Sequence, residues 1–291
     1  MQDFNSESVP LEGDHSQKVK DPSNGTDSGS KDFINLPSPT AVSRIMRNIR
    51  LILAYKGTAY SGWQHTGIGT SIEEALSKAL QIVLQHPVKL QAASRTDAGV
   101  HAHGQVVNFF SESQVPLDRL QYSLNHLLPK DIVVREIGLA AEAFHPTMDA
   151  LKKEYRYEVC HGSVQLPFFR ETSWHFPYPL DLESMQMAAH HLVGSHDFST
   201  FCNERSLWDR NPVCNLEQIE IVLVGLDRLR ITLLGDHFLY KMVRNLVGTL
   251  VYVGCGKLRE DEIADILRSK DRTRAGMTAP AHGLRLERVF Y

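Results

Sequence analysis

The sequence predicts an α+β fold made of two tandem units of the same kind. Three observations predict it. Some segments alternate apolar and polar residues as strands do, others place apolar residues at helical spacing, and the order β-α-β-β-α-β occurs twice after the first 45 residues. This order is the ferredoxin-like, split-βαβ arrangement, an antiparallel sheet with helices on one face. Two such units side by side would form one continuous sheet with a central cleft where they meet.

The first unit is expected over residues 46–148. Its first strand, 47–55, has alternate apolar residues on one face: Ile49, Leu51, Leu53 and Tyr55. A helix over 70–84 is predicted from its apolar spacing and from Ser71 and Glu74, which are three residues apart as in a capping box. The remaining elements expected here are strands 88–93 and 105–110, helix 117–128 and strand 132–139.

The second unit is expected over residues 149–291. It begins with a strand over 153–160, and a helix follows that starts after Asp181 and ends at Gly194. The rest of the order is a hairpin of strands 216–225 and 229–235, helices 238–253 and 260–268, and a final strand 282–291.

Residues 1–45 differ in composition from both units. They are rich in Ser, Asp, Asn, Gly and Pro, and seven acidic against four basic residues account for the whole net charge of −3. Because few of these residues are apolar, their burial cannot offset the conformational entropy lost on ordering. We therefore expect a disordered acidic tail. The rest of the chain is neutral overall, and a nucleic-acid site there would have to be a local basic patch.

Composition also narrows the class of protein. No apolar run approaches the roughly 18 residues that cross a membrane, so no membrane role is expected. The four cysteines form no C-x-x-C pair, which argues against a zinc ribbon or a disulfide framework. These features favour a cytoplasmic protein with reduced cysteines.

The stretch SRTDAGVHAHG, residues 94–104, concentrates ionisable residues around a turn. Asp97 and Gly99 are ordinary turn residues, which is the plain interpretation. The alternative is a reactive carboxylate at Asp97 whose charged form is favoured by Arg95. Choosing between the two depends on the rest of the chain.

Five further stretches occur in a fixed order: YSGWQ at 60–64, NHLLPKDI at 125–132, KEYRY at 153–157, GSHDFSTF at 194–201 and YKMVRNLVG at 240–248. Each has an ordinary structural interpretation by itself. Together with Arg95–Gly99 and Gly283–Leu284 they resemble the TruA-type tRNA pseudouridine synthases, from about Ile49 to Tyr291.

The resemblance implies a homodimer without cofactor or metal that converts uridine to pseudouridine in the anticodon stem-loop of tRNA, at tRNA positions 38 to 40. Asp97 matches the catalytic aspartate of the family, and Tyr155 matches the tyrosine that stacks on the target base. Arg244 matches the arginine that pairs with the aspartate, and Arg95 and Leu284 belong to the substrate-binding set.

Four positions depart from the family pattern. Ser94 stands where many relatives have glycine, and His65, Thr147 and Cys214 stand where relatives usually have basic residues. The last three changes are expected to remove contacts with RNA and leave the chemistry intact.

Two other functions compete with this interpretation. A metal-dependent hydrolase could use His101 and His103, which share a strand face, with Asp97 as a third ligand. A non-catalytic RNA-binding protein could be built from tandem ferredoxin-like units, although QVVNFF lacks the RNA-recognition consensus and such a protein gives no reason for Asp97.

Overall fold

A computed structural model of the chain describes residues 45–64, 67, 69–203 and 211–291. The tail expected over 1–45 therefore lies outside the described residues, apart from Ile45, and so does His65. Residues Arg44–Tyr291 form one compact unit. No helix in the described part of the chain is long and apolar enough to cross a membrane.

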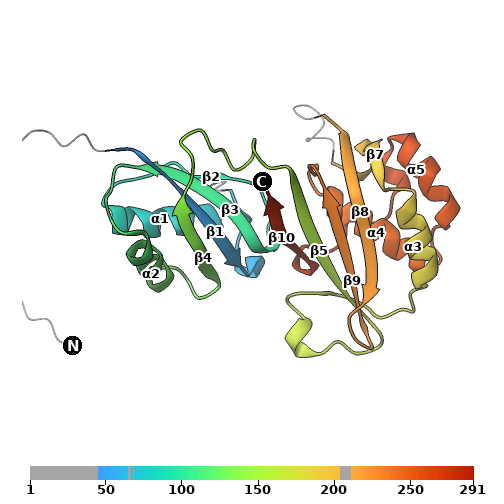
Figure 1. Cartoon of the computed structure of the whole chain (residues 1–291). Coiled ribbons are helices and arrows are strands. Elements are labelled where there is room, and N and C mark those ends of the chain that lie inside the picture. Colours follow the sequence, from blue (N-terminus) through green and yellow to red (C-terminus); the bar gives the residue numbers. More distant parts are fainter. Residues whose placement is uncertain (1–44, 65–66, 68, 204–210) are drawn as a thin grey trace, which may run out of the picture. The chain divides into compact units, whose positions relative to one another are not determined.

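Ten strands form one sheet, in which eight follow the order β4-β1-β3-β10-β5-β9-β8-β7 (Figure 1). Two short strands lie off this path, with β2 paired to β3 and β6 paired to β5. The strands are β1 (Arg47–Tyr55), β2 (Gln91–Ala92), β3 (His101–Ser111), β4 (Ile132–Leu139), β5 (Lys152–His161), β6 (Trp174–Phe176), β7 (Gly194–Asp197), β8 (Val213–Leu223), β9 (Arg228–Gly235) and β10 (Leu284–Phe290).

This order contains the ferredoxin-like arrangement twice. In the first half β1 lies between β4 and β3, and β2 pairs with the other edge of β3. In the second half β5 lies between β10 and β9, and β8 follows β9 in the same way. The halves join where β10 pairs in parallel with β3, through Arg285 beside His101 and Leu286 beside Ala102. The predicted fold class is confirmed.

The described residues form five α-helices, of which α1 and α4 lie behind the strands in Figure 1 and α3 and α5 lie to the right of β8 in that view. They are α1 (Ile72–Leu84), α2 (Leu117–Leu127), α3 (Leu182–His190), α4 (Met242–Gly254) and α5 (Ile263–Ser269). The predicted caps of α1 and α3 are confirmed: the Ser71 hydroxyl accepts from Glu74 N, and the Asp181 carboxylate accepts from Glu183 N and Ser184 N.

Several elements differ from the sequence prediction, including β6, for which no strand was expected. The strand expected over 88–93 is reduced to β2, and the Gln105 side chain bonds the backbone N–H and C=O of Ser94 where the chain leaves β3. The helix expected between Asp181 and Gly194 ends at His190, and Gly194 begins β7. The helix expected over 238–253 begins only at Met242, because Lys241 has a φ of 60°, which an α-helix cannot include.

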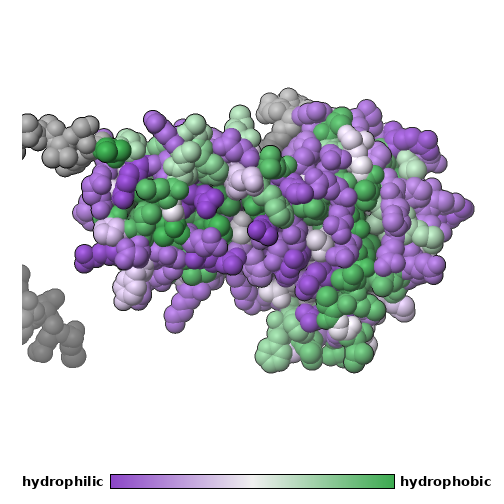
Figure 2. Space-filling view, viewed as in Figure 1, coloured by the Kyte–Doolittle hydropathy of each residue, from purple (hydrophilic) through white to green (hydrophobic). Residues whose placement is uncertain are grey.

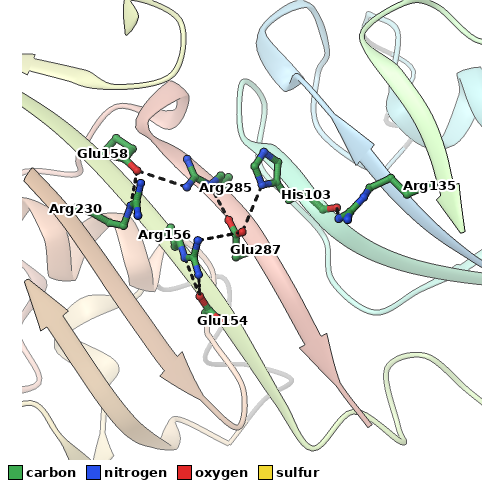
Figure 3. A network of polar contacts seen from close by, with 8 residues as sticks. All are labelled: His103, Arg135, Glu154, Arg156, Glu158, Arg230, Arg285 and Glu287. Carbon is green, nitrogen blue, oxygen red and sulfur yellow. Dashed lines mark hydrogen bonds and ion pairs between the residues drawn. The ribbon is translucent and has the colours of Figure 1, made fainter. Parts of the chain in front are cut away.

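The helix-free face of the sheet carries a network of ion pairs and hydrogen bonds (Figure 3). The network crosses the junction between the halves where His103 Nδ1 lies 3.4 Å from Glu287 Oε1. Polar side chains cover much of this face (Figure 2), as expected for the solvated side of an antiparallel sheet. The network consists of His103, Arg135, Glu154, Arg156, Glu158, Arg230, Arg285 and Glu287.

Candidate active site

Asp97 lies in the loop between β2 and β3, which we call the Asp97 loop (residues 93–100). Its Oδ2 lies 2.9 Å from Nη1 of Arg244, the third residue of α4 in the other half of the chain. The two side chains are 19% and 14% exposed. The pair is therefore a charge-assisted hydrogen bond that is partly shielded from water.

Residues 277–279, which precede β10, pack against α4, and Ala279 bonds the Arg244 side chain. Its Nε donates to the backbone oxygen of Ala279 at 2.7 Å, and the Ala279 N–H returns a bond to Arg244 O at 3.1 Å. This segment approaches α4 so closely that a Cβ on Gly248 would lie 1.7 Å from Met277 O. The bonds to Ala279 thus fix the guanidinium that faces Asp97.

The Asp97 loop is anchored on its other side at Thr96. The Thr96 hydroxyl lies 2.8 Å from the Tyr55 hydroxyl of β1, and Thr96 O accepts from Trp63 N at 3.0 Å. Gly62 makes this approach possible, because it has a φ of 104° and a Cβ there would lie 2.7 Å from Thr96 O. Burial raises the pKa of Tyr55 well above its usual range, so its phenol stays neutral.

Tyr155 comes from β5 and lies 6% exposed beside the loop. Its ring meets that of Phe238 edge-on, with centroids 5.1 Å apart and planes at 78°. Its hydroxyl lies 2.7 Å from Ser94 Oγ. The ring is therefore held by the Phe238 ring and at its own hydroxyl end.

All five site residues predicted from the sequence line one pocket of about 790 Å³: Arg95, Asp97, Tyr155, Arg244 and Leu284. Leu284 is 5% exposed and belongs to the apolar core that borders the pocket. Arg95 is exposed, and among the hydrogen bonds and ion pairs of the described residues none joins it to Asp97. The expected Arg244–Asp97 pair thus forms, whereas the expected support from Arg95 is not seen as a contact.

The lining of the pocket is locally basic although the chain beyond the tail is neutral. Its basic residues are Lys89, Arg95, Lys153, Lys241 and Arg244, against the acidic Glu73 and Asp97. Such a cluster suits the phosphates of a nucleic acid. Sequence reasoning missed Lys89 and Lys153 here, and also Phe238, which lay inside a predicted helix.

A model of the tRNA pseudouridine synthase family matches residues 51–144 and 188–291. tRNA pseudouridine synthase A 2 of Protochlamydia amoebophila is 47% identical over 256 residues, which is 87% of this chain and 98% of the relative. The chain belongs to the tRNA pseudouridine synthase family. It is accordingly an isomerase of the kind that makes pseudouridine.

Other comparisons agree in family. tRNA pseudouridine synthase A of Thermoanaerobacter sp. strain X514 is 42% identical over 254 residues, 84% of this chain and all of the relative at 100%. Among solved structures, a chain of a Cbf5–Nop10–Gar1 complex aligns at 13% identity with a TM-score of 0.34, over 81% of this chain and 57% of that chain. A likeness of that size adds nothing to the family assignment.

Two of the described departures from the family pattern, Thr147 and Cys214, have different surroundings. Thr147 lines the pocket, and its hydroxyl donates to Ala92 O at 2.7 Å. Cys214 is fully buried, and burial raises the pKa of its thiol to about 12. Position 214 therefore supplies no surface charge in this chain.

The residues expected to hold a metal ion in a hydrolase, Asp97, His101 and His103, form no metal site within the described part of the chain. His101 Nδ1 accepts from Gly57 N at 2.9 Å, and Nε2 lies 2.9 Å from Glu171 O and 3.0 Å from His282 O. Both ring nitrogens are thus engaged by backbone groups, and the Asp97 carboxylate pairs with Arg244. Across the described ranges, no three His, Cys, Asp or Glu side chains gather to hold a metal ion.

Proposed function

We propose that this protein isomerises uridine to pseudouridine in the anticodon stem-loop of tRNA, at positions 38 to 40, with Asp97 as the catalytic carboxylate. The observation that carries the proposal is the Asp97–Arg244 pair, 2.9 Å apart in a basic pocket that Tyr155 also lines. The relatives are tRNA pseudouridine synthases by name, and the basic lining supports a polyanionic substrate.

The reaction requires a carboxylate at the sugar. The C1′–N1 bond breaks, the base turns, and a C1′–C5 bond forms while C5 loses a proton and N1 gains one. The Asp97 carboxylate can either add to C1′ or help to remove a proton from the sugar, and in both routes the contact with Arg244 orients it. No step needs a metal or a redox partner.

The other site residues hold the nucleotide. The target base must leave the helical stack to reach the pocket, and the Tyr155 ring offers an aromatic surface against which it can turn. Leu284 supplies an apolar wall, and the exposed Arg95 is suited to a backbone phosphate.

The remaining parts of the proposal concern organisation. We assign residues 46–148 to a unit that carries Asp97 and residues 149–291 to a second unit that carries Tyr155, Arg244 and Leu284. A homodimer in the cytoplasm is the form in which the chain would meet tRNA, as the family resemblance implies.

The test is the Asp97→Asn variant on a tRNA transcript with uridine at positions 38 to 40. Single-turnover isomerisation is followed by tritium release from uridine C5, and the product is mapped by position. The amide has the shape of the acid but is neither nucleophile nor base, so we expect parental tRNA binding and no detectable pseudouridine. Activity of the variant within tenfold of the parent would exclude Asp97, and modification at other positions would exclude the anticodon stem-loop.

A further inference from the structure

Two side chains of β5 reach across the junction to the Asp97 loop. Lys153 Nζ donates to Ala93 O at 2.7 Å, and the Tyr155 hydroxyl lies 2.7 Å from Ser94 Oγ. Lys153 and Tyr155 are alternate residues of one strand and therefore share a face. They bind consecutive residues of a loop that carries Asp97 three positions later.

Ser94 presents its hydroxyl from a fixed backbone. Its N–H donates to Gln105 Oε1 at 3.3 Å, and its C=O accepts from Gln105 Nε2 at 2.6 Å. Gln105 is fully buried in β3. The serine is thus a rigid point between the Asp97 loop and the Tyr155 ring.

We propose that Ser94 is a positioning residue, whose bond to the Tyr155 hydroxyl holds that ring at a set angle to Asp97. Phe238 meets the ring edge-on, and the Ser94 bond fixes its far end. The inference rests on the proposed roles of Asp97 and Tyr155.

The physical consequence is an effect on rate with little effect on tRNA binding. A base detached from its sugar is held by the Tyr155 surface, and a ring that swings would carry C5 away from C1′. Affinity for the RNA comes mainly from contacts to its backbone, which this bond does not touch. Loss of the bond should therefore lower kcat and leave KM nearly unchanged.

The experiment is a double-mutant cycle on single-turnover isomerisation with Ser94→Ala, Tyr155→Phe and the double variant. Loss of one neutral hydrogen bond corresponds to about a fivefold lower rate. Each single variant should show that loss, and the double variant should be no slower than either single one, because all three remove the same bond. A Ser94→Ala rate within twofold of the parent, or losses that multiply in the double variant, would overturn the proposal.

Ser269→Ala is the matched control. It also removes a half-buried serine hydroxyl, which donates to Ile266 O at 2.7 Å and accepts from Asp271 N at 3.3 Å, but Ser269 ends α5 and does not line the pocket. Its rate should equal that of the parent.

Thermal unfolding checks that each variant is folded. If Ser94→Ala does not fold, Tyr155→Phe tests the same bond. An inactive parent or an active Asp97→Asn variant would refute the proposed function, whereas a parental Ser94→Ala rate beside an inactive Asp97→Asn refutes this inference alone.

Discussion

Gly57 N–H donates to Nδ1 of His101 at 2.9 Å, which joins the turn after β1 to the first residue of β3. The same ring bonds Glu171 O and His282 O through Nε2, so one neutral histidine links four segments of the chain. A second proton on this ring would have to displace the Gly57 bond.

Stability should therefore depend on the protonation of His101. Burial lowers the pKa of His101 below its ordinary value of 6.5, and burial also lowers that of His282. Between the lowered value and 6.5 the unfolded chain binds protons that the folded chain does not, so stability falls as pH drops through this window and is retained above it. Besides these two rings, the charged groups near His101 are Lys56 and Glu171.

The measurement is the Tm of the parent and of His101→Phe between pH 7.5 and pH 5. The variant should be less stable at pH 7.5 by about 1–3 kcal/mol, because Gly57 N–H loses its acceptor, and its Tm should fall less on acidification. His126→Phe, at an exposed position on α2, is the control and should follow the parent. Parallel Tm curves for His101→Phe and the parent would contradict the prediction.

Arg244→Lys should lower the isomerisation rate by about 10- to 100-fold. The guanidinium bonds Asp97 and Ala279 through separate nitrogens, and a single ammonium cannot reproduce that fork. The rate is measured in single turnover, with tRNA binding measured separately. Arg268→Lys alters an exposed pair with Asp265 on α5 and should be parental. Equal rates for the two variants would show that charge alone suffices at position 244.

Tyr155→Leu should be at least tenfold slower than Tyr155→Phe. Phenylalanine loses only the hydroxyl, whereas leucine loses the aromatic surface, and stacking of a base on a ring contributes about 1–3 kcal/mol. Single-turnover rates are compared at temperatures where both variants are folded. If both are equally active, Tyr155 serves as core packing and not as a surface for the base.

Gly248→Ala should destabilise the protein by about 1–3 kcal/mol, because the new methyl group would overlap Met277 O and push the Ala279 segment away from Arg244. Gly138→Ala on β4 is the matched control, since a Cβ there meets nothing within 4 Å. Both are measured by chemical unfolding. Equal stability of the two variants would mean that the segment can shift without cost.

Deletion of residues 1–45 should leave the isomerisation rate within about threefold, a change of less than 1 kcal/mol in the barrier. The first strand begins at Arg47, and the family match begins at residue 51. A hundredfold loss in single turnover would place part of the catalytic unit within the deleted residues.

Much of the fold was predictable because it depends on neighbours in the chain. The alternation of β1 placed Ile49, Leu51 and Leu53 in the core, where they are fully buried. The caps at Ser71 and Asp181 involve residues two or three positions away. Such features follow from local periodicity and from the hydrogen-bonding needs of a helix start.

The site was predicted from motifs as a set of residues, and of its geometry only arginine support for Asp97 was expected, from Arg244 by the family resemblance and from Arg95 by its place in the loop. The turn at Lys241 that delays α4 and the shortening of the expected strand to β2 were not predicted. Local propensity is a weak guide to such element ends, because tertiary contacts override it.

The sequence by itself thus determined the two repeated units and the residues Asp97, Tyr155 and Arg244 as members of one family pattern. Only the tertiary structure decided that β10 joins the halves and that, of the two arginines expected to support the Asp97 carboxylate, Arg244 of α4 bonds it at 2.9 Å, whereas among the described residues no such contact joins it to the neighbouring Arg95. The physical reason is that side chains adjacent in a loop can point apart, whereas a helix packed across a sheet junction can aim a distant side chain at the same atom.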